Sequence, residues 1–200
     1  MLEDLKKSTE RFTGGQRLSA DQLAALLRQT KRGMFRFRDD GGTPNHPRWP
    51  VIIYWNVVQL PRTLDPAAVM EKFFESNDWG KSWRNGIYDY LHYHSSVHEV
   101  LGIARGSAKV RLGGDRGRTF KLSAGDVVIL PAGTGHQGLG ASKDFLVVGA
   151  YPASGKYDEC GPGAEEHDRS IKSIEKVKRP RKDPLFGAEG PLLKLWKPKR

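Results

Sequence analysis

Three histidines and one glutamate occur in this chain at spacings that suit a metal site. His92 and His94 are two residues apart, Glu99 follows shortly after them, and His136 lies in a second motif further along. Side chains two apart on a β-strand point to the same face, so the paired histidines are expected to project together while Tyr93 faces away. An apolar strand starting at Glu99 brings a carboxylate to the same point.

Turn-forming residues stand where the second motif must change direction. The buried-strand run 127–130 follows the turn signal Gly125-Asp126 and precedes a second turn over 131–135, which delivers His136. Each histidine taken alone is an ordinary surface or hydrogen-bonded residue. The conjunction of four candidate ligands with these turns predicts a metal site built from two neighbouring hairpins.

Three imidazoles and one carboxylate suit Mn, Fe, Co, Ni, Cu or Zn and suit Ca or Mg poorly. In octahedral geometry four protein ligands leave two positions for water, dioxygen or a chelating substrate. We therefore predict that His92, His94, Glu99 and His136 bind a divalent transition metal at an open site, without selecting among these metals.

The other histidines and the cysteine carry weaker signals. His98 follows the opposite strand parity from Glu99, so it is expected behind the ligands or in a loop. His46 and His167 lie in Pro- and Gly-rich surroundings that suggest no role. Cys160 is the one cysteine, which rules out an internal disulfide and fits a reducing compartment, and we interpret it as a passive loop thiol.

Two tyrosines share strand parity with the paired histidines. Tyr88 and Tyr90 are therefore predicted to lie near the metal and, with Glu99, to be catalytic candidates that orient an oxygen-bearing substrate. The alternative is that their rings fill barrel volume with satisfied hydroxyls. Leu101 and Ile103 share the face of Glu99, which predicts an apolar wall beside the metal.

The remaining pattern predicts an all-β fold with two peripheral helices. A capping box at Ser19 opens a helix through about Lys31, and Asp65-Pro66 opens a second helix with an apolar stripe. Short strands and turns follow from residue 87 to residue 151, as in a β-barrel or double-sheet roll. An irregular C-terminal extension follows, whose apolar residues 192–196 are expected to fold back onto the barrel.

Length and composition fit one domain of 200 residues with 38% hydrophobic residues. We divide it into an N-terminal helical arm (1–44), a β-barrel with the metal site (45–157) and a basic C-terminal extension (158–200). The apolar stretches are too short to span a bilayer and no leader pattern opens the chain, so we expect a soluble, cytoplasmic protein without a membrane partner.

Positive charge is concentrated near the end of the chain. Residues 169–200 contain eleven Lys or Arg and three acidic residues, which accounts for eight of the ten net positive charges. The cluster 176–182 is compatible with nuclear import in a eukaryote or with a weak nucleic-acid contact. We favour a solvated basic tail, because no nucleic-acid-binding motif is present; a third reading is that the tail attracts anionic substrates.

The two motifs resemble the paired signatures of the cupin superfamily. The first, from Gly86 to Gly106, matches completely; the second departs at Gly140, where the cupin pattern usually has an asparagine that is not a ligand. A closer resemblance, to the YjlB-like cupins, covers roughly residues 45–197. The segments that carry it are 77–86, 92–102, 130–136, 147–152, 183–187 and 190–196.

The resemblance implies a cupin jelly-roll β-barrel, a metal and, as is common in cupins, a homodimer, but it implies no reaction. Two enzymatic hypotheses follow from the predicted site: an Fe(II)-type dioxygenase, which we slightly prefer, or a redox-neutral isomerase, decarboxylase or lyase in which the metal is a Lewis acid. Further hypotheses are a non-catalytic module that binds a small ligand and a scaffold whose basic tail binds an acidic partner.

Overall fold

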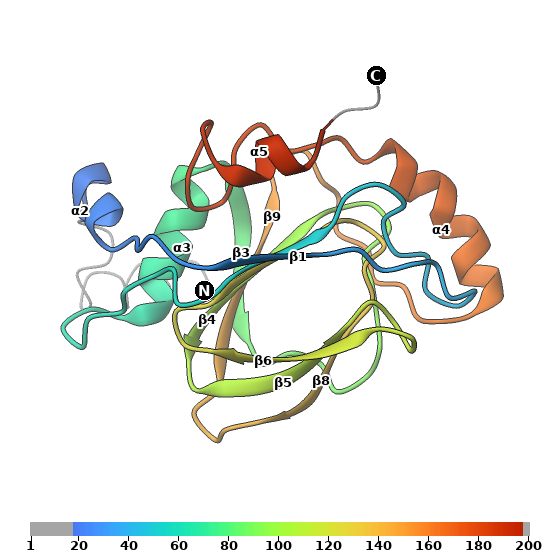
Figure 1. Cartoon of the computed structure of the whole chain (residues 1–200), viewed down its shortest axis with the longest axis horizontal. Helices are drawn as coiled ribbons and strands as arrows, with labels where there is room; N and C mark the ends of the chain where they lie inside the picture. The colour runs from blue at the N-terminus through green and yellow to red at the C-terminus, as the bar shows by residue number, and fades with distance from the viewer. Residues whose placement is uncertain (1–17, 198–200) are drawn as a thin grey trace, which may run out of the picture.

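Two antiparallel β-sheets form the body of the protein in a computed structural model that describes residues 18–197. The first seventeen residues of the predicted arm and the last three of the predicted extension lie outside this range. The sheets face each other across a barrel-like interior (Figure 1). This confirms the predicted all-β, double-sheet fold.

The larger sheet has six strands and the smaller sheet has three. In spatial order the larger sheet contains β1 (Arg32–Phe35), β2 (Val51–Tyr54), β7 (Val127–Leu130), β4 (Glu99–Arg105), β9 (Leu146–Pro152) and β3 (Trp79–Asn85). The smaller sheet contains β6 (Arg118–Ser123), β5 (Ser107–Leu112) and β8 (His136–Ala141). Strand β1 pairs with β2 although it lies within the range predicted to form the arm.

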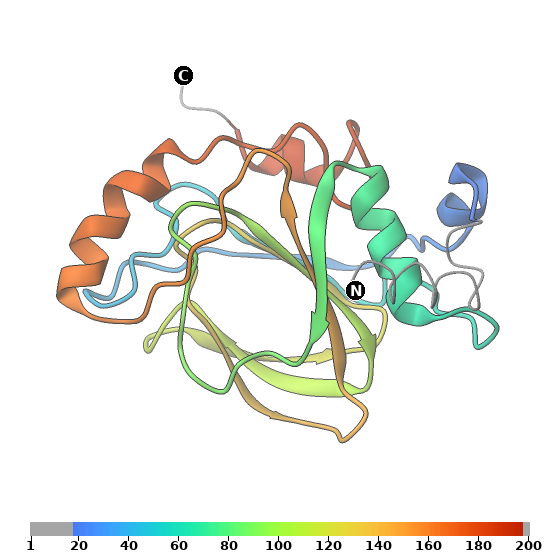
Figure 2. The same ribbon diagram turned by 180° about the vertical axis from the view of Figure 1, so that it is seen from behind.

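The four central strands of the larger sheet, β2, β7, β4 and β9, are buried on both faces, because helices cover the side that turns away from the smaller sheet. Helix α3 (Pro66–Ser76) lies along this outer face beside β3 (Figure 2). A methyl group on Gly102 of β4 would lie 2.9 Å from both Met70 and Phe74 of the helix, so only glycine permits this close approach. Successive side chains of these strands therefore point alternately into two separate cores, one between the sheets and one under the helices.

The two predicted helices had different outcomes. Helix α3 begins as predicted, with Asp65 as its N-cap and Pro66 in its first turn. Helix α2 (Ala20–Ala25) has the predicted capping box at Ser19 but ends at Ala25, so the prediction of a helix to Lys31 was wrong. The chain beyond it bonds instead to the segment after β2, and β1 follows directly.

The prediction of an irregular C-terminal extension was also wrong. Helix α4 (Ala164–Lys176) has two glutamates in its first turn and a lysine in its last, an arrangement that complements the helix dipole. Helix α5 (Pro191–Leu195) lies over the larger sheet (Figure 1). Within residues 18–197, no helix combines the length and the apolar character that crossing a bilayer requires.

Trp196 connects the end of the chain to the core. Its side chain is fully buried, stacks on Trp49 at a ring distance of 5.2 Å and donates a hydrogen bond to the backbone carbonyl of Pro50 at 2.9 Å. In return, the indole N–H of Trp49 donates to the carbonyl of Lys197. Two indoles thus attach the C-terminal segment to the start of β2.

We expect Trp196→Ala to lower the free energy of unfolding by about 3–5 kcal/mol, because it leaves a large cavity and an unpaired carbonyl. Lys194→Ala, an exposed change in the same short helix, is expected to alter it by less than about 0.5 kcal/mol. Urea unfolding measures both values. Equal stabilities for the two variants would show that the C-terminal segment does not support the core.

Candidate metal centre

His92 and His94 lie in the loop between β3 and β4 and not in a regular strand. The predicted strand is reduced to two isolated bridges, His92 with His136 and Tyr93 with Cys160. The alternation of side chains is nevertheless kept. Tyr93 is fully buried on the opposite side, where its hydroxyl donates to Ser170 at 3.1 Å.

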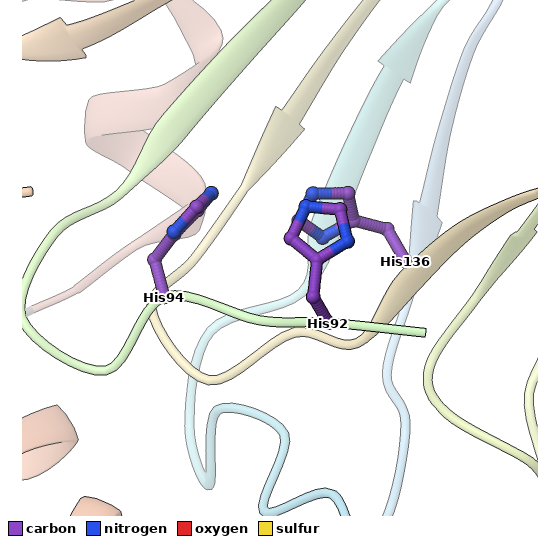
Figure 3. A group of neighbouring side chains, drawn as sticks. All are labelled: His92, His94 and His136. Atoms are coloured by element: carbon purple, nitrogen blue, oxygen red, sulfur yellow. The ribbon is translucent and has the colours of Figure 1, made fainter. Parts of the chain in front are cut away.

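Paired backbone hydrogen bonds bring the two motifs together. The amide of His92 donates to the carbonyl of His136 at 3.2 Å, and the amide of His136 donates back at 2.9 Å. The two rings are 4.0 Å apart, and His94 is about 5.5 Å from each. Figure 3 shows the three side chains on one side of the backbone, two from the loop and one from β8.

The Nδ1 atom of each of these imidazoles faces a backbone carbonyl. His92 is paired in this way with Tyr90 at 3.3 Å, and His136 with Thr134 at 3.1 Å. His94 makes the same contact with the carbonyl of Asp158. A carbonyl only accepts, so each Nδ1 carries a proton, which in the neutral ring leaves the Nε2 lone pair free to bind a metal.

The Glu99 carboxylate faces two of these Nε2 atoms. Its Oε2 is 3.3 Å from Nε2 of His94 and 3.3 Å from Nε2 of His136. Glu99 is the first residue of β4 and is fully buried, and within the described chain Oε2 has no hydrogen-bond partner. An orphaned, buried carboxylate oxygen beside two imidazole nitrogens fits a cation between them.

Electrostatics in the metal-free protein agree with this geometry. Burial opposes the charged form of His94, but the Glu99 carboxylate outweighs it and raises the pKa of His94 to about 9. Burial likewise opposes ionisation of Glu99, yet His94 and His136 hold the pKa of this carboxyl below its ordinary value. Burial and the charge of His136 lower the pKa of His92 to about 4. The centre therefore holds the negative charge of Glu99, which protonated His94 or a bound metal ion can neutralise.

The three imidazoles together form a cluster able to hold a metal ion. Their ligand atoms lie within 4.8 Å of one another, and all three residues are buried. Glu99 adds the negatively charged ligand that the spacing predicted. The structure brings all four predicted ligands to one point, and their role as metal ligands stays a prediction.

Asp158 supports the loop that carries His94, a role that no sequence pattern indicated. Its carboxylate accepts hydrogen bonds from the amides of Ser95 and Ser96 at 3.0 Å each and from the hydroxyl of Ser95 at 2.6 Å. The thiol of Cys160 contacts the same carboxylate at 3.5 Å. Burial raises the pKa of this thiol, which agrees with its interpretation as a passive residue.

The four residues open onto a cavity of about 410 Å³ in the mouth of the barrel. Leu101 lines it as predicted, whereas Ile103 is buried in the core between the sheets. Tyr88 lies in its wall, 5.2 Å from the ring of His92. Tyr90 is about half exposed, lies outside the wall and donates to Glu159 at 3.0 Å. Catalytic roles for both tyrosines stay predictions.

Tyr151 and Tyr157 also line the cavity and were missed in the sequence. The hydroxyl of Tyr151 accepts a 2.9 Å hydrogen bond from the indole of Trp83 and lies beside Glu99. Burial and the Glu99 charge raise the pKa of Tyr151. Strands β9 and β4 pair so that Ala150 is opposite Val100, which places Tyr151 beside Glu99. Only knowledge of this strand pairing could have identified it.

The protein YjlB of Bacillus subtilis is 38% identical over 160 residues, which cover 80% of this chain and 93% of that protein. The chain belongs to the YjlB family. This confirms the predicted family, and the relative is described only as an uncharacterized protein. No family model matches the chain.

Solved structures that resemble this YjlB-family chain are similar over part of their length. A cupin 2 domain-containing protein from Halorhodospira halophila is 15% identical, with coverage of 74% of this chain and 83% of that one and a TM-score of 0.32. Oxalate decarboxylase is 20% identical over 60% of this chain and 29% of that one, with a TM-score of 0.35. QdtA, a 3,4-ketoisomerase from Thermoanaerobacterium thermosaccharolyticum, is 18% identical over 48% and 75%, with a TM-score of 0.39.

The remaining histidines of this YjlB-family protein are buried outside the metal centre. His98 accepts a 2.8 Å hydrogen bond from the amide of Ala132 at Nδ1, and its ring contacts Trp49 and Trp196. His167 is paired with Asp39 and with a neighbouring aspartate. His98 thus lies behind the ligands, on the face that its parity predicted.

His46 is held neutral by its surroundings. Its Nδ1 accepts hydrogen bonds from the amides of Arg48 and Trp49, and burial, reinforced by the charge of Arg48, lowers its pKa to about 3. The unfolded chain binds a proton near pH 6.5, whereas the folded chain does not until about pH 3. Stability contributed by neutral His46 is therefore present above pH 6.5 and is lost as the pH falls towards 3.

His46→Asn keeps a side-chain acceptor for the two amides but cannot be protonated. We expect the free energy of unfolding of the wild type to fall more steeply between pH 6 and 4 than that of this variant, by about 1.4 kcal/mol per pH unit. Urea titrations at four or five pH values measure both slopes. Parallel pH profiles for the two proteins would contradict the neutral, buried state of His46.

Proposed function

We propose that this protein binds one divalent transition-metal ion through His92, His94, Glu99 and His136 and uses it as an enzyme on a small organic molecule. The observation that carries the proposal is the shared orientation of the imidazoles. Each donates its Nδ1–H to a backbone carbonyl, which directs Nε2 towards the centre. A histidine cluster with only a structural role would not need all three Nε2 atoms directed at the centre, where a carboxylate oxygen has no hydrogen-bond partner within the described chain.

The cavity is the proposed substrate site. When bound, the metal supplies a Lewis acid with free coordination positions for a substrate oxygen or for dioxygen. Trp83 and Leu101 provide apolar wall, and Lys81 provides a cation whose ammonium also donates to the carbonyl of Gly155 at 3.4 Å. A small organic anion is therefore the kind of molecule that this cavity suits best.

Two kinds of chemistry fit this site. Four protein ligands leave two coordination positions on the metal, and the neighbouring cavity wall is apolar. Both features support an Fe(II)-type dioxygenase, which remains our first proposal. The contact of Tyr151 with Glu99 favours the second, a redox-neutral isomerase, decarboxylase or lyase. That chemistry needs a proton-transferring group, and the Tyr151 hydroxyl has the Trp83 indole as donor and Glu99 beside it. A non-catalytic binding module shares the same site and differs only in lacking turnover.

Side chains of the basic cluster 176–182 make contacts within the protein, which supports a secondary role for this cluster in function. Arg179 donates to the carbonyl of Leu193 at 2.8 Å, and Lys182 pairs with Asp78 at 3.0 Å. Groups engaged in this way are less available to an acidic macromolecule. We therefore propose a small-molecule ligand and not a nucleic acid as the partner; a cytoplasmic location and a homodimer stay predictions.

Metal content tests the proposed ligand set. His94→Ala and His136→Ala are each expected to lower affinity for Fe(II) or Zn(II) by at least about a hundredfold, since even residues behind the ligands cost 10- to 100-fold when changed. His98→Asn, which keeps an acceptor for the Ala132 amide, is expected to retain one metal per chain. Elemental analysis after anaerobic purification measures occupancy. Undiminished metal in His94→Ala would refute the proposed site.

Turnover tests the choice of chemistry. With iron-loaded protein, the oxygenase proposal predicts oxygen uptake that depends on an added small acid, thiol or phenol. Tyr151→Phe is expected to leave metal content unchanged and to reduce kcat by about 10²- to 10⁴-fold if Tyr151 transfers a proton. Tyr93→Phe, whose hydroxyl contacts Ser170 on the side away from the cavity, is the matched control. Unaltered kcat in Tyr151→Phe would exclude a proton-transfer role for this hydroxyl.

A further inference from the structure

A second cavity lies on the opposite side of the segment 153–157 from the metal centre. It has a volume of about 400 Å³ and lies between the loop before β4, the loop after β9 and the end of α4. The loop after β9 runs beside the loop before β4 and continues into α4 (Figure 2). Gly155 shows how close the two sites are, because it lines the second cavity while its carbonyl contacts Lys81 of the first.

The wall of this cavity is polar and positively charged. It includes three serine hydroxyls and two lysines, contributed by Ser96, Ser154, Ser173, Lys176 and Lys178. None of the described residues that line it is acidic. Within residues 18–197, neither lysine forms an ion pair with a carboxylate. Two unpaired ammonium groups and several hydroxyl donors around one hollow favour an anion.

His98 forms a buried part of the same wall. Its side chain is 1% exposed, and its Nδ1 accepts from the Ala132 amide, so the neutral ring carries its proton on Nε2. Within the described chain, Nε2 meets no hydrogen-bond partner of acceptable geometry, although the backbone of Lys178 lies beside it. Because this nitrogen has no surface open to the cavity, His98 shapes the wall beside Lys178 and is not one of the groups that contact an anion.

The rest of the wall gives the anion an organic part. Val97, Pro152 and Val177 contribute apolar surface, and the cavity is larger than an inorganic oxyanion requires. Lysine ammonium groups bind phosphate as point charges, and serine hydroxyls can donate to several oxygens of one phosphate group. We propose that this cavity binds the phosphate group of a small phosphomonoester, with the apolar residues contacting its organic part.

The proposal assigns a role to the start of the basic cluster. Lys176 and Lys178 belong to it, whereas Lys182 and Arg179 are engaged in structural contacts elsewhere. The cavity is also separate from the metal centre, since no residue lines both cavities. Binding here therefore does not depend on the metal, and the two proposals can fail independently.

Isothermal titration of chelator-treated protein with phenyl phosphate and with inorganic phosphate tests the site. Metal-free protein is used because phosphate also binds metals. We expect one phenyl phosphate per chain, bound more tightly than inorganic phosphate, with affinity that falls as salt is raised. The double variant Lys176→Gln/Lys178→Gln is expected to weaken binding at least about tenfold, because it removes both charges.

A matched control removes two charges away from the cavity. Lys172→Gln/Lys109→Gln changes exposed lysines on α4 and β5 and is expected to leave the affinity within about twofold. Equal losses in the two double lysine variants would overturn the proposal in favour of a non-specific basic surface. Absence of binding by the wild type, or loss of binding in His136→Ala, would also overturn it.

Discussion

The burial of Glu99 among three imidazoles is the constraint on which the site depends. An unpaired carboxylate inside a protein is costly, and this one is 2% exposed. In the metal-free protein, a proton on His94 provides the compensating charge. A divalent cation would do so more completely and would release that proton. The same geometry thus stabilises the buried carboxylate and prepares the centre to bind a metal.

Rigid elements on both sides hold this arrangement in place. Glu99 begins a strand that is buried on both faces, and His136 begins a strand of the opposite sheet. The loop that carries the other two histidines has little regular structure, so its support comes from Asp158 and from the backbone bridges to His136 and Cys160. The segment after β9 therefore contributes to the site in three ways. It orients His94, supplies Tyr157 to the cavity wall and separates the two cavities.

Local signals in the sequence predicted the ligands, and long-range pairing determined the rest of the site. Strand parity correctly separated His92 and His94 from Tyr93, and it placed His98 behind Glu99, because parity is a property of a few consecutive residues. Tyr151 lies some fifty residues from Glu99 and reaches it only through the pairing of β4 with β9. Asp158 is similar, since its partners are about sixty residues earlier. The helix predicted to reach Lys31 ended early because residues 26–28 hydrogen-bond to the segment after β2, a tertiary effect that propensity does not contain.

X-ray absorption spectroscopy of the protein loaded with zinc or iron tests the central claim most directly. We predict a metal shell of nitrogen and oxygen at about 2.0–2.2 Å, with the outer-shell scattering of three imidazoles and with exchangeable solvent in the remaining positions. Substitution of Glu99 by glutamine should remove one oxygen ligand and leave the imidazole signal. A shell that contains sulfur, or one with no imidazole scattering, would contradict the proposed centre.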